Sequence, residues 1–285
     1  MRSRPARLAA TGAVAITVSF VLVASSAAAP PAASASSPAA PLARPAAPPP
    51  LAAVSVDPAA VAAAVTAAVR GVSKRADVGL IVWDRALAAP LVSVEADRRF
   101  RSASLVKLLI AIQAAPDPTR RARVERMLRD SNDDDASILW GLHGGDALPA
   151  AAAATLGRTG PTAPDIPGRW GNTPLTPDDV LAACQHLLTT LPTLVDPMRA
   201  APRRAADGFD QHFGIPSAFP APWAVKQSWG SAADHVAVHS TGTLGAGDRY
   251  IVVLMTNHPP GTPFRSATAA VTAGAQALAS TLTLT

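Results

Sequence analysis

The segment Ser104-Leu-Val-Lys-Leu-Leu-Ile-Ala-Ile112 contains one charged residue in an otherwise apolar run. Its apolar side chains leave no polar face, a pattern typical of a helix that is buried on all sides. Pro116 and Pro118 end this helix, because proline lacks a backbone donor and clashes with the preceding turn. The segment 104–115 is therefore predicted to be the central buried helix of the domain.

The order of the other elements indicates a single α+β unit. The residue patterns predict a helix over 58–70, a hairpin of strands over 78–83 and 91–95, helices over 119–128 and 136–142, a helix that starts at Thr176, strands over about 224–229, 235–244 and 250–257, and a last helix over 264–278. We therefore expect an antiparallel sheet flanked by helices, whose N-terminal and C-terminal strands are separated in the sequence by the helical region.

The N-terminal residues are typical of an exported protein. Arg2, Arg4 and Arg7 precede an apolar segment that ends in small residues, which predicts a signal peptide over residues 1–29. An uncleaved membrane anchor is the alternative, since the segment approaches the ~20 residues that a membrane span requires. The Pro- and Ala-rich residues 30–52 predict an extended linker.

We expect the folded domain to occupy residues 53–285 and to be secreted or extracellular, with cell-wall association as a further option and no membrane contact after signal cleavage. The one cysteine, Cys184, lies far from the N-terminal segment, so no lipid anchor is expected. Its apolar neighbours predict a small buried residue of a helix.

The charge distribution excludes nucleic-acid binding. The formal charge is +5, and three positive charges belong to arginines of the acid-free signal segment, which leaves +2 (5 − 3) for the mature chain. The remaining arginines are scattered, without the basic stripe and interleaved aromatic residues of a nucleic-acid interface. We expect a monomer that acts on a small molecule or a peptide.

Lysine is rare in this chain and its positions are informative. Only three of the 25 basic residues are lysines, among them Lys107 in the buried helix and Lys226 in a predicted strand. Arginine stays protonated in proteins, whereas a buried lysine can lose its proton and act as a base. Ser104 lies three residues before Lys107, on the same helix face, so the amine could take the serine proton.

Two other segments resemble metal-binding motifs. The run Asp130–Asp135 begins like a calcium loop, but Asp135 stands where the loop needs glycine and Gly141 where it needs glutamate. His235 and His239 have a spacing that a strand could use for zinc, but a third ligand is missing. We expect neither a metal nor another cofactor.

Several motifs in fixed order resemble those of one enzyme superfamily. Phe100-Arg-Ser-Ala-Ser-Leu-Val-Lys107 resembles the nucleophile motif of the penicillin-recognising serine hydrolases, which include class A β-lactamases and D-alanyl-D-alanine peptidases. The segment 129–133 resembles their Ser-x-Asn element, 226–228 their Lys-Thr-Gly strand and 168–173 the loop below the class A site. The similarity covers about residues 76–280 and is greatest to compact, secreted members from high-GC Gram-positive bacteria.

This resemblance implies a role for each matching residue. Ser104 would be the acylated nucleophile and Lys107 its base, and Ser131 would pass a proton to the leaving group. Lys226 would hold Ser131 and attract a substrate carboxylate. The backbone N–H groups of Ser104 and Trp229 would form the oxyanion hole, and Trp229 would contact the substrate.

The chain also departs from the superfamily pattern at three substrate-binding positions. Asp133 replaces the asparagine of the Ser-x-Asn element, and an ionised carboxylate accepts hydrogen bonds without donating any. Gln227 replaces a threonine or serine, and Ser228 replaces a glycine. The loop 169–173 lacks the glutamate with which class A β-lactamases deacylate.

The sequence thus favours a secreted serine hydrolase that forms an acyl-enzyme on Ser104 with a β-lactam or a D-alanyl peptide and deacylates slowly. A catalytically degenerate domain of the same fold, which binds cell-wall peptide or a protein partner, is the alternative. The short spacing between Lys107 and Ser131 predicts a reduced helical subdomain.

Overall fold

The computed structural model describes residues 57–282. The predicted signal segment 1–29 and linker 30–52 lie outside these residues. The predicted domain over 53–285 is therefore described except at its two ends.

A five-stranded antiparallel sheet forms the centre of the described domain, with the strand order β2-β1-β7-β6-β5. Its strands are β1 (Asp77–Asp84), β2 (Ala89–Val94), β5 (Trp223–Ser231), β6 (Val236–Leu244) and β7 (Tyr250–His258). Strand β1 pairs with β2 as a hairpin and with β7 on its other side. The N-terminal hairpin and the three C-terminal strands thus form one sheet, which confirms the predicted α+β fold.

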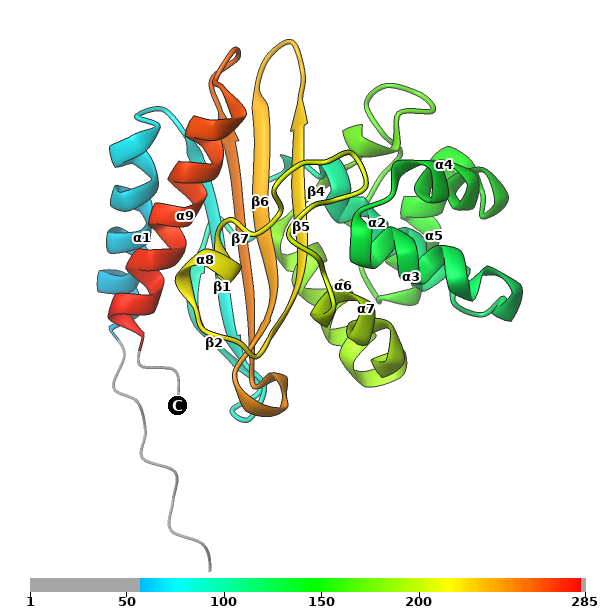
Figure 1. Ribbon diagram of the computed structural model, residues 1–285, viewed down its shortest axis with the longest axis horizontal. Helices are drawn as coiled ribbons and strands as arrows, with labels where there is room; N and C mark the ends of the chain where they lie inside the picture. The colour runs from blue at the N-terminus through cyan, green and yellow to red at the C-terminus, as the bar shows by residue number, and fades with distance from the viewer. Residues whose placement is uncertain (1–56, 283–285) are drawn as a thin grey trace, which may run out of the picture. The chain divides into compact units, whose positions relative to one another are not determined.

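Helices cover both faces of this sheet (Figure 1). One face is covered by α1 (Pro58–Val72) and α9 (Phe264–Thr281), with the short α8 (Ile215–Ala218) beside α9. The helices of the other side are α2 (Val106–Ala114), α3 (Arg121–Asp130), α4 (Asp133–Leu142), α5 (Leu148–Thr155), α6 (Pro177–Thr190) and α7 (Val195–Arg199). A small sheet of β3 (Phe100–Arg101) and β4 (Pro174–Leu175) links this helical side to the nucleophile segment.

Strand β7 shows how the sequence directs side chains to both layers. Ile251, Val253 and Met255 belong to the hydrophobic core on the side of α2, whereas Val252 and Leu254 belong to the core under α1 and α9. Successive side chains of a strand point to opposite faces, so a continuous apolar run is what a strand covered on both sides requires. Each such side chain contributes about 1.5–3 kcal/mol of burial free energy.

The predicted central helix is confirmed as a buried helix, with one difference at its start. Every residue of α2 except Gln113 is buried. The α-helix begins at Val106, and Ser104 lies in the preceding 3₁₀ turn, Ala103–Leu105. Ser104 is therefore held by a tighter turn than the first turn of an α-helix.

Several helices differ from the sequence-based expectation. Helix α4 begins at Asp133 rather than at residue 136, because Asn132 caps it by accepting a hydrogen bond from the backbone of Asp135. The three acidic residues of its first turn lie near the positive end of the helix dipole. The alanine-rich α5 was not expected, since a run of alanines has little amphipathic pattern. The start at Thr176 is confirmed by a capping box with Asp179.

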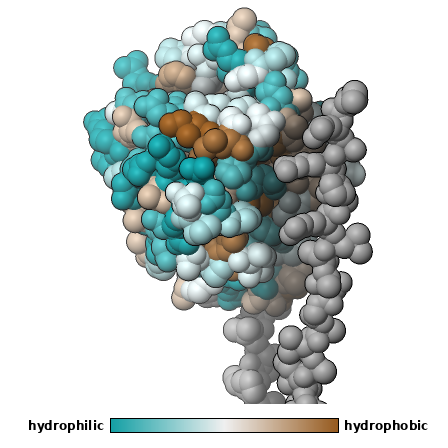
Figure 2. Space-filling view, turned by 90° about the vertical axis from the view of Figure 1, so that its right-hand side faces the viewer, coloured by the Kyte–Doolittle hydropathy of each residue, from teal (hydrophilic) through white to brown (hydrophobic). Residues whose placement is uncertain are grey.

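The surface of the helical side is mainly hydrophilic, with small hydrophobic patches (Figure 2). Two exposed hydrophobic residues of α4 are Ile138 and Leu142. Within residues 57–282, no helix combines the length and the apolar character needed to cross a membrane.

A buried histidine of β6 ties the nucleophile segment to the sheet. His239 is fully buried, its Nε2 lies 2.8 Å from the carbonyl of Arg101, and its Nδ1 accepts the backbone N–H of Thr256 at 3.0 Å. This pattern is that of a neutral imidazole that donates from Nε2. Burial lowers the pKa of His239 from 6.5 to about 4. The neutral ring thus fixes β3, three residues before Ser104.

We expect the close contact of α9 with α1 to make Gly274→Ala destabilising. A Cβ on Gly274 would lie 2.6 Å from Cγ2 of Val69, which is fully buried and cannot move away. Overpacking of this kind costs about 1–3 kcal/mol. Gly71→Ala is the matched control in α1, because nothing lies within 4 Å of its Cβ position and the change should stabilise by about 0.5–1 kcal/mol. Urea unfolding of both variants measures the difference, and equal stability would contradict this packing.

We also expect the domain to lose stability in acid because of His239. Its folded-state pKa of about 4 lies below the ordinary 6.5, so the unfolded chain binds more protons between these values. The stabilising contribution is complete above pH 6.5 and falls as the pH drops towards 4, by about 2 kcal/mol between pH 7 and pH 5. Burial gives His258 a shift in the same direction. Urea unfolding at both pH values tests this, and His239→Gln should lose less stability on acidification than the parent chain.

Candidate active site

A cleft of about 340 Å³ lies beside the end of β5 and the turn that carries Ser104. Its lining residues are Arg101, Ala103, Ser104, Asp133, Gly168, Arg169, Trp170, Gly171, Asn172, Asp207, Trp229 and Gly230. They come from the nucleophile turn, the start of α4, the loop before β4, the loop before α8, and β5. Of the residues predicted from the sequence, Ser104, Asp133 and Trp229 line this cleft.

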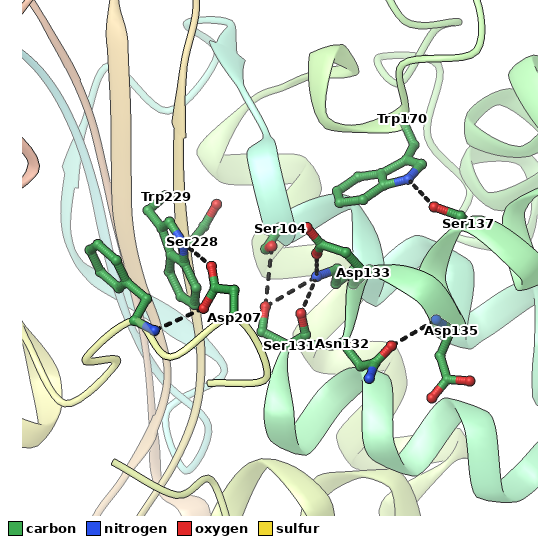
Figure 3. Close-up of polar contacts among 12 residues, drawn as sticks. Ser104, Ser131, Asn132, Asp133, Asp135, Ser137, Trp170, Asp207, Ser228 and Trp229 are labelled. Atoms are coloured by element: carbon green, nitrogen blue, oxygen red, sulfur yellow. Dashed lines mark hydrogen bonds and ion pairs between the residues drawn. The ribbon is translucent and has the colours of Figure 1, made fainter. Parts of the chain in front are cut away.

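Ser131 is the centre of a hydrogen-bonded group that includes Ser104 and both buried lysines. Its hydroxyl donates to Ser104 Oγ at 3.2 Å (Figure 3). Its oxygen accepts from Lys107 Nζ at 3.1 Å and from Lys226 Nζ at 2.9 Å. The four residues predicted to be catalytic are therefore brought together. Lys107 reaches Ser104 through Ser131, whereas the sequence predicted that the two side chains would meet directly on one helix face.

The backbone around both serines is unusual. Ala103 has φ 43° and Ser131 has φ 54°, a left-handed conformation that non-glycine residues seldom adopt. At Ser131 it ends α3 and turns the backbone carbonyl towards Lys107 Nζ, which donates to it at 2.6 Å. Residues held in such conformations are concentrated at functional sites.

Both amines are almost completely removed from solvent. The Lys107 side chain is 0% exposed, and Lys226 is 1% exposed. Burial lowers the pKa of Lys107, and the Asp133 carboxylate opposes this shift. Burial lowers the pKa of Lys226 well below its usual range, and the positive charge of Lys107 adds to this effect. Lys226 therefore loses its proton more easily than an exposed lysine does.

Asp133 forms an ion pair with the amine of Lys107 and lies between that amine and the solvent. Its Oδ1 lies 2.5 Å from Lys107 Nζ, and its own side chain is 66% exposed. The ring of Trp170 lies on the same amine, with its centroid 5.1 Å from Nζ. A carboxylate and an aromatic face both favour the cationic form of lysine.

Two of the predicted substrate-binding side chains face away from the cleft. Gln227 is buried and its amide donates to the carbonyl of Phe213 at 2.5 Å. Ser228 is buried and its hydroxyl donates to the carbonyl of Ser102 at 2.8 Å. Neither side chain is among those that line the cleft, so the geometry does not support their predicted contact with a substrate. Ser228 instead fastens β5 to the nucleophile segment.

Trp229 is positioned by a loop that the sequence analysis missed. Its indole N–H donates to Asp207 at 3.1 Å, and its ring stacks on Phe209 at 4.4 Å between centroids. The negative charge of Asp207 also raises the pKa of both buried lysines. The segment before β5 has no pattern that predicts this contact, because it depends on where the loop folds back. Arg101 and Arg169 are further cleft residues without a sequence signal.

The loop 168–172 supplies no carboxylate to the cleft. Gly171 lies beside the nucleophile turn, and a Cβ placed on it would be 3.6 Å from Cα of Ala103. Asp178 and Asp179 belong to the first turn of α6 instead, where Asp179 accepts the backbone N–H of Thr176. The loop thus contains neither the glutamate of the class A β-lactamases nor any other acidic residue.

The histidines considered for zinc do not form a site. His239 is occupied by Arg101 and Thr256, as described above, and His235 pairs with Asp234. In the part of the chain that the structure describes, no three His, Cys, Asp or Glu side chains are grouped to hold a metal ion.

Comparison with known proteins identifies a distant homologue. No model of a known protein family matches the chain. The protein named "Putative lipoprotein LppW", from Mycobacterium tuberculosis and from Mycobacterium bovis, is 32% identical to the chain over 206 residues. The match spans 65% of this chain and 64% of the length of each relative, so more than a third of each relative lies outside it. The identity indicates distant homology.

Solved structures resemble the chain over nearly their whole length. The β-lactamase of Desulfarculus baarsii has a TM-score of 0.61 at 20% identity, with 81% of this chain and all of that chain covered. A class A β-lactamase of Bacteroides cellulosilyticus has a TM-score of 0.59 at 14% identity, with 78% and 98% covered. Identities this low concern the fold alone, and the chain has the α+β fold of the class A β-lactamases.

Proposed function

We propose that this protein is an extracytoplasmic serine acyl-transfer enzyme that opens a β-lactam or cleaves a D-alanyl peptide through an acyl-enzyme on Ser104. The hydrogen-bonded group of Ser104, Ser131 and two buried lysines at the cleft carries this proposal. A serine needs a neighbouring base to become a nucleophile, and a desolvated amine is one way to supply it.

Several residues of the cleft support the proposed reaction. Ser104 Oγ would give its proton to a buried amine through Ser131 and form a bond to the substrate carbonyl carbon. When the carbon–nitrogen bond then breaks, the leaving nitrogen would take up that proton by way of Ser131 Oγ. The backbone N–H groups of Ser104 and Trp229 would stabilise the oxyanion, which is usually the largest catalytic contribution. Arg101 and Arg169 line the same cleft and would attract a substrate carboxylate.

Release of the acyl group is expected to be slow. The loop 168–172 provides glycine, arginine, tryptophan and asparagine, but no carboxylate that could activate a water molecule. The two carboxylates that do line the cleft are engaged elsewhere, Asp133 with Lys107 and Asp207 with Trp229. General-base activation contributes about 10²–10⁴-fold to such a step. The acyl-enzyme should therefore accumulate.

Two observations support the proposed location outside the cytoplasm. The sequence begins with a segment typical of an export signal. The distant mycobacterial homologue carries the name of a lipoprotein. Both agree with a substrate found at the cell wall.

A second candidate function is a binding domain that has lost the chemistry. The ion pair between Asp133 and Lys107 occupies one amine, and Gln227 and Ser228 are bonded to backbone carbonyls rather than available to a substrate. Such a domain would hold a cell-wall peptide or a protein partner in the cleft without reacting. Its binding would be insensitive to Ser104→Ala.

We expect a penicillin to form a lasting covalent adduct with the purified protein. Intact-mass spectrometry after incubation should show the added mass of one penicillin molecule on the parent chain, and none on Ser104→Ala. Loss of free penicillin in the same tubes distinguishes slow from rapid release. Adduct formation by Ser104→Ala would rule out Ser104 as the nucleophile. If several penicillins and a D-alanyl peptide give neither adduct nor hydrolysis, the binding domain is the better account.

We further expect Gly171→Glu to shorten the life of this adduct at least tenfold. The Cβ position of Gly171 is in ordinary contact distance of Ala103, so a side chain can begin there without a clash, and a glutamate would add a carboxylate near the nucleophile turn that can activate water. Gly171→Gln is the matched control, with the same shape but no base. Decay of the adduct is followed by mass spectrometry after removal of free penicillin. An unchanged lifetime in a folded Gly171→Glu variant would show that a missing carboxylate is not what limits release.

A further inference from the structure

We propose that Lys226, rather than Lys107, accepts the proton of Ser104 through Ser131, and that Asp133 keeps Lys107 cationic. This assignment reverses the roles that the sequence motifs imply for the two lysines. Its catalytic consequence rests on the proposed function, but the charge of each amine can be measured without a substrate.

The contacts of Lys107 are those of an ammonium ion. Its Nζ faces the Ser131 carbonyl, Ser131 Oγ and Asp133 Oδ1, three acceptors for three N–H donors. The carboxylate at 2.5 Å forms a charge-assisted hydrogen bond, the stronger kind. Loss of the proton would leave the Asp133 carboxylate facing an uncharged amine and would also remove the cation from the Trp170 ring.

The contacts of Lys226 fit a neutral amine. Its Nζ lies 2.9 Å from the carbonyl of Gln227 and 2.9 Å from Ser131 Oγ. One N–H can donate to the carbonyl, and the nitrogen lone pair can accept the Ser131 hydroxyl when that hydroxyl rotates away from Ser104 Oγ. Ser104 then donates its own hydroxyl to Ser131 Oγ across the same 3.2 Å contact. Among residues 57–282, no carboxylate forms an ion pair with Lys226. Its uncharged form therefore leaves no charge without a partner.

The charged groups around the two amines also favour a cationic Lys107 and a neutral Lys226. Asp133 and Asp207 raise the pKa of each lysine, but only Asp133 is in contact, and its contact is with Lys107. Lys107 in turn lowers the pKa of Lys226. Two ammonium groups that share one hydroxyl oxygen repel each other in a buried site, where the effective dielectric constant is low. One cation is favoured, and Asp133 determines that it is Lys107.

The proton route then runs through a single relay. Ser104 donates its hydroxyl proton to Ser131 Oγ as its own oxygen bonds to the carbonyl carbon, and Ser131 passes its proton to Lys226 Nζ. When the carbon–nitrogen bond breaks, Lys226 returns the proton through Ser131 to the leaving nitrogen. Lys107 stays charged throughout and stabilises the negative charge that develops on the serine oxygens.

The rarity of lysine makes the test direct. Protein labelled with ¹³C at lysine Cε has three lysine signals, from Lys74, Lys107 and Lys226, and the shift of each reports whether its amine is protonated. Replacement of each lysine in turn assigns the signals. With rising pH we expect Lys226 to lose its proton first and Lys107 later, while the exposed Lys74 serves as the internal reference. Loss of the proton from Lys107 before Lys226 would overturn the proposal.

Asp133→Asn tests the cause of this order. The change should lower the pH at which Lys107 titrates, and by more than it lowers that of Lys226, because the ion pair is with Lys107. Asp134→Asn is the matched control, an exposed neighbour in the same helical turn that forms no ion pair with either lysine. Equal effects of both substitutions on Lys107 would contradict the role of Asp133.

The rate of penicillin adduct formation connects the two amines to chemistry. We expect this rate to rise over the pH range in which the Lys226 signal titrates, and a rate that follows the Lys107 signal instead would also overturn the proposal. A protein in which Lys226 titrates first but no adduct ever forms would retain the assigned charges and would count against the proposed function only. The two failures are thus distinguishable.

Discussion

The burial of two amines around one serine hydroxyl is the constraint on which the rest of the site depends. The amines of Lys107 and Lys226 both lie within hydrogen-bonding distance of Ser131 Oγ, and neither has appreciable contact with solvent. Removal of a charge from water is costly unless the charge has a partner. At Lys107 the carboxylate of Asp133 offsets this cost. At Lys226 the cost is avoided because the amine can lose its proton easily. Both solutions leave Ser131 bonded to Ser104.

The fold brings these groups together from separate elements. Lys107 comes from the buried helix α2, Lys226 from the edge strand β5, and Ser131 from the left-handed link between α3 and α4. Ser228 and His239 each bond to a backbone carbonyl of the segment before Ser104, so the sheet fixes the nucleophile turn directly. A fixed site of this kind needs little reorganisation during reaction, which is how preorganised polar groups lower a barrier.

Periodicity was sufficient to predict the sheet and the central helix, whereas the resemblance to the penicillin-recognising serine hydrolases supplied the group of Ser104, Lys107, Ser131 and Lys226. The sheet and the helix depend on local patterns, such as the apolar runs after Ser104 and along β7. The directions of Gln227 and Asp207 were beyond prediction, because each depends on a loop from elsewhere in the chain: Phe213 supplies the carbonyl that binds Gln227, and the fold of the same region places Asp207 against Trp229. Helix α5 was not predicted either, because its alanines lack an amphipathic pattern.

The physical cost of the site bears on which candidate function is better supported. A domain that only binds a ligand gains nothing from two desolvated lysines in contact with one hydroxyl, since apolar side chains of similar volume would usually pack there at no loss of stability. Left-handed backbone at Ala103 and Ser131 adds further strain at the same place. The departures at Asp133 and in the loop 169–173 would alter the charge of one amine and the supply of a base for release, but the bonded chain from Ser104 to Lys226 is present. This bonded chain is the observation that favours the proposed acyl-enzyme over a domain that only binds a ligand.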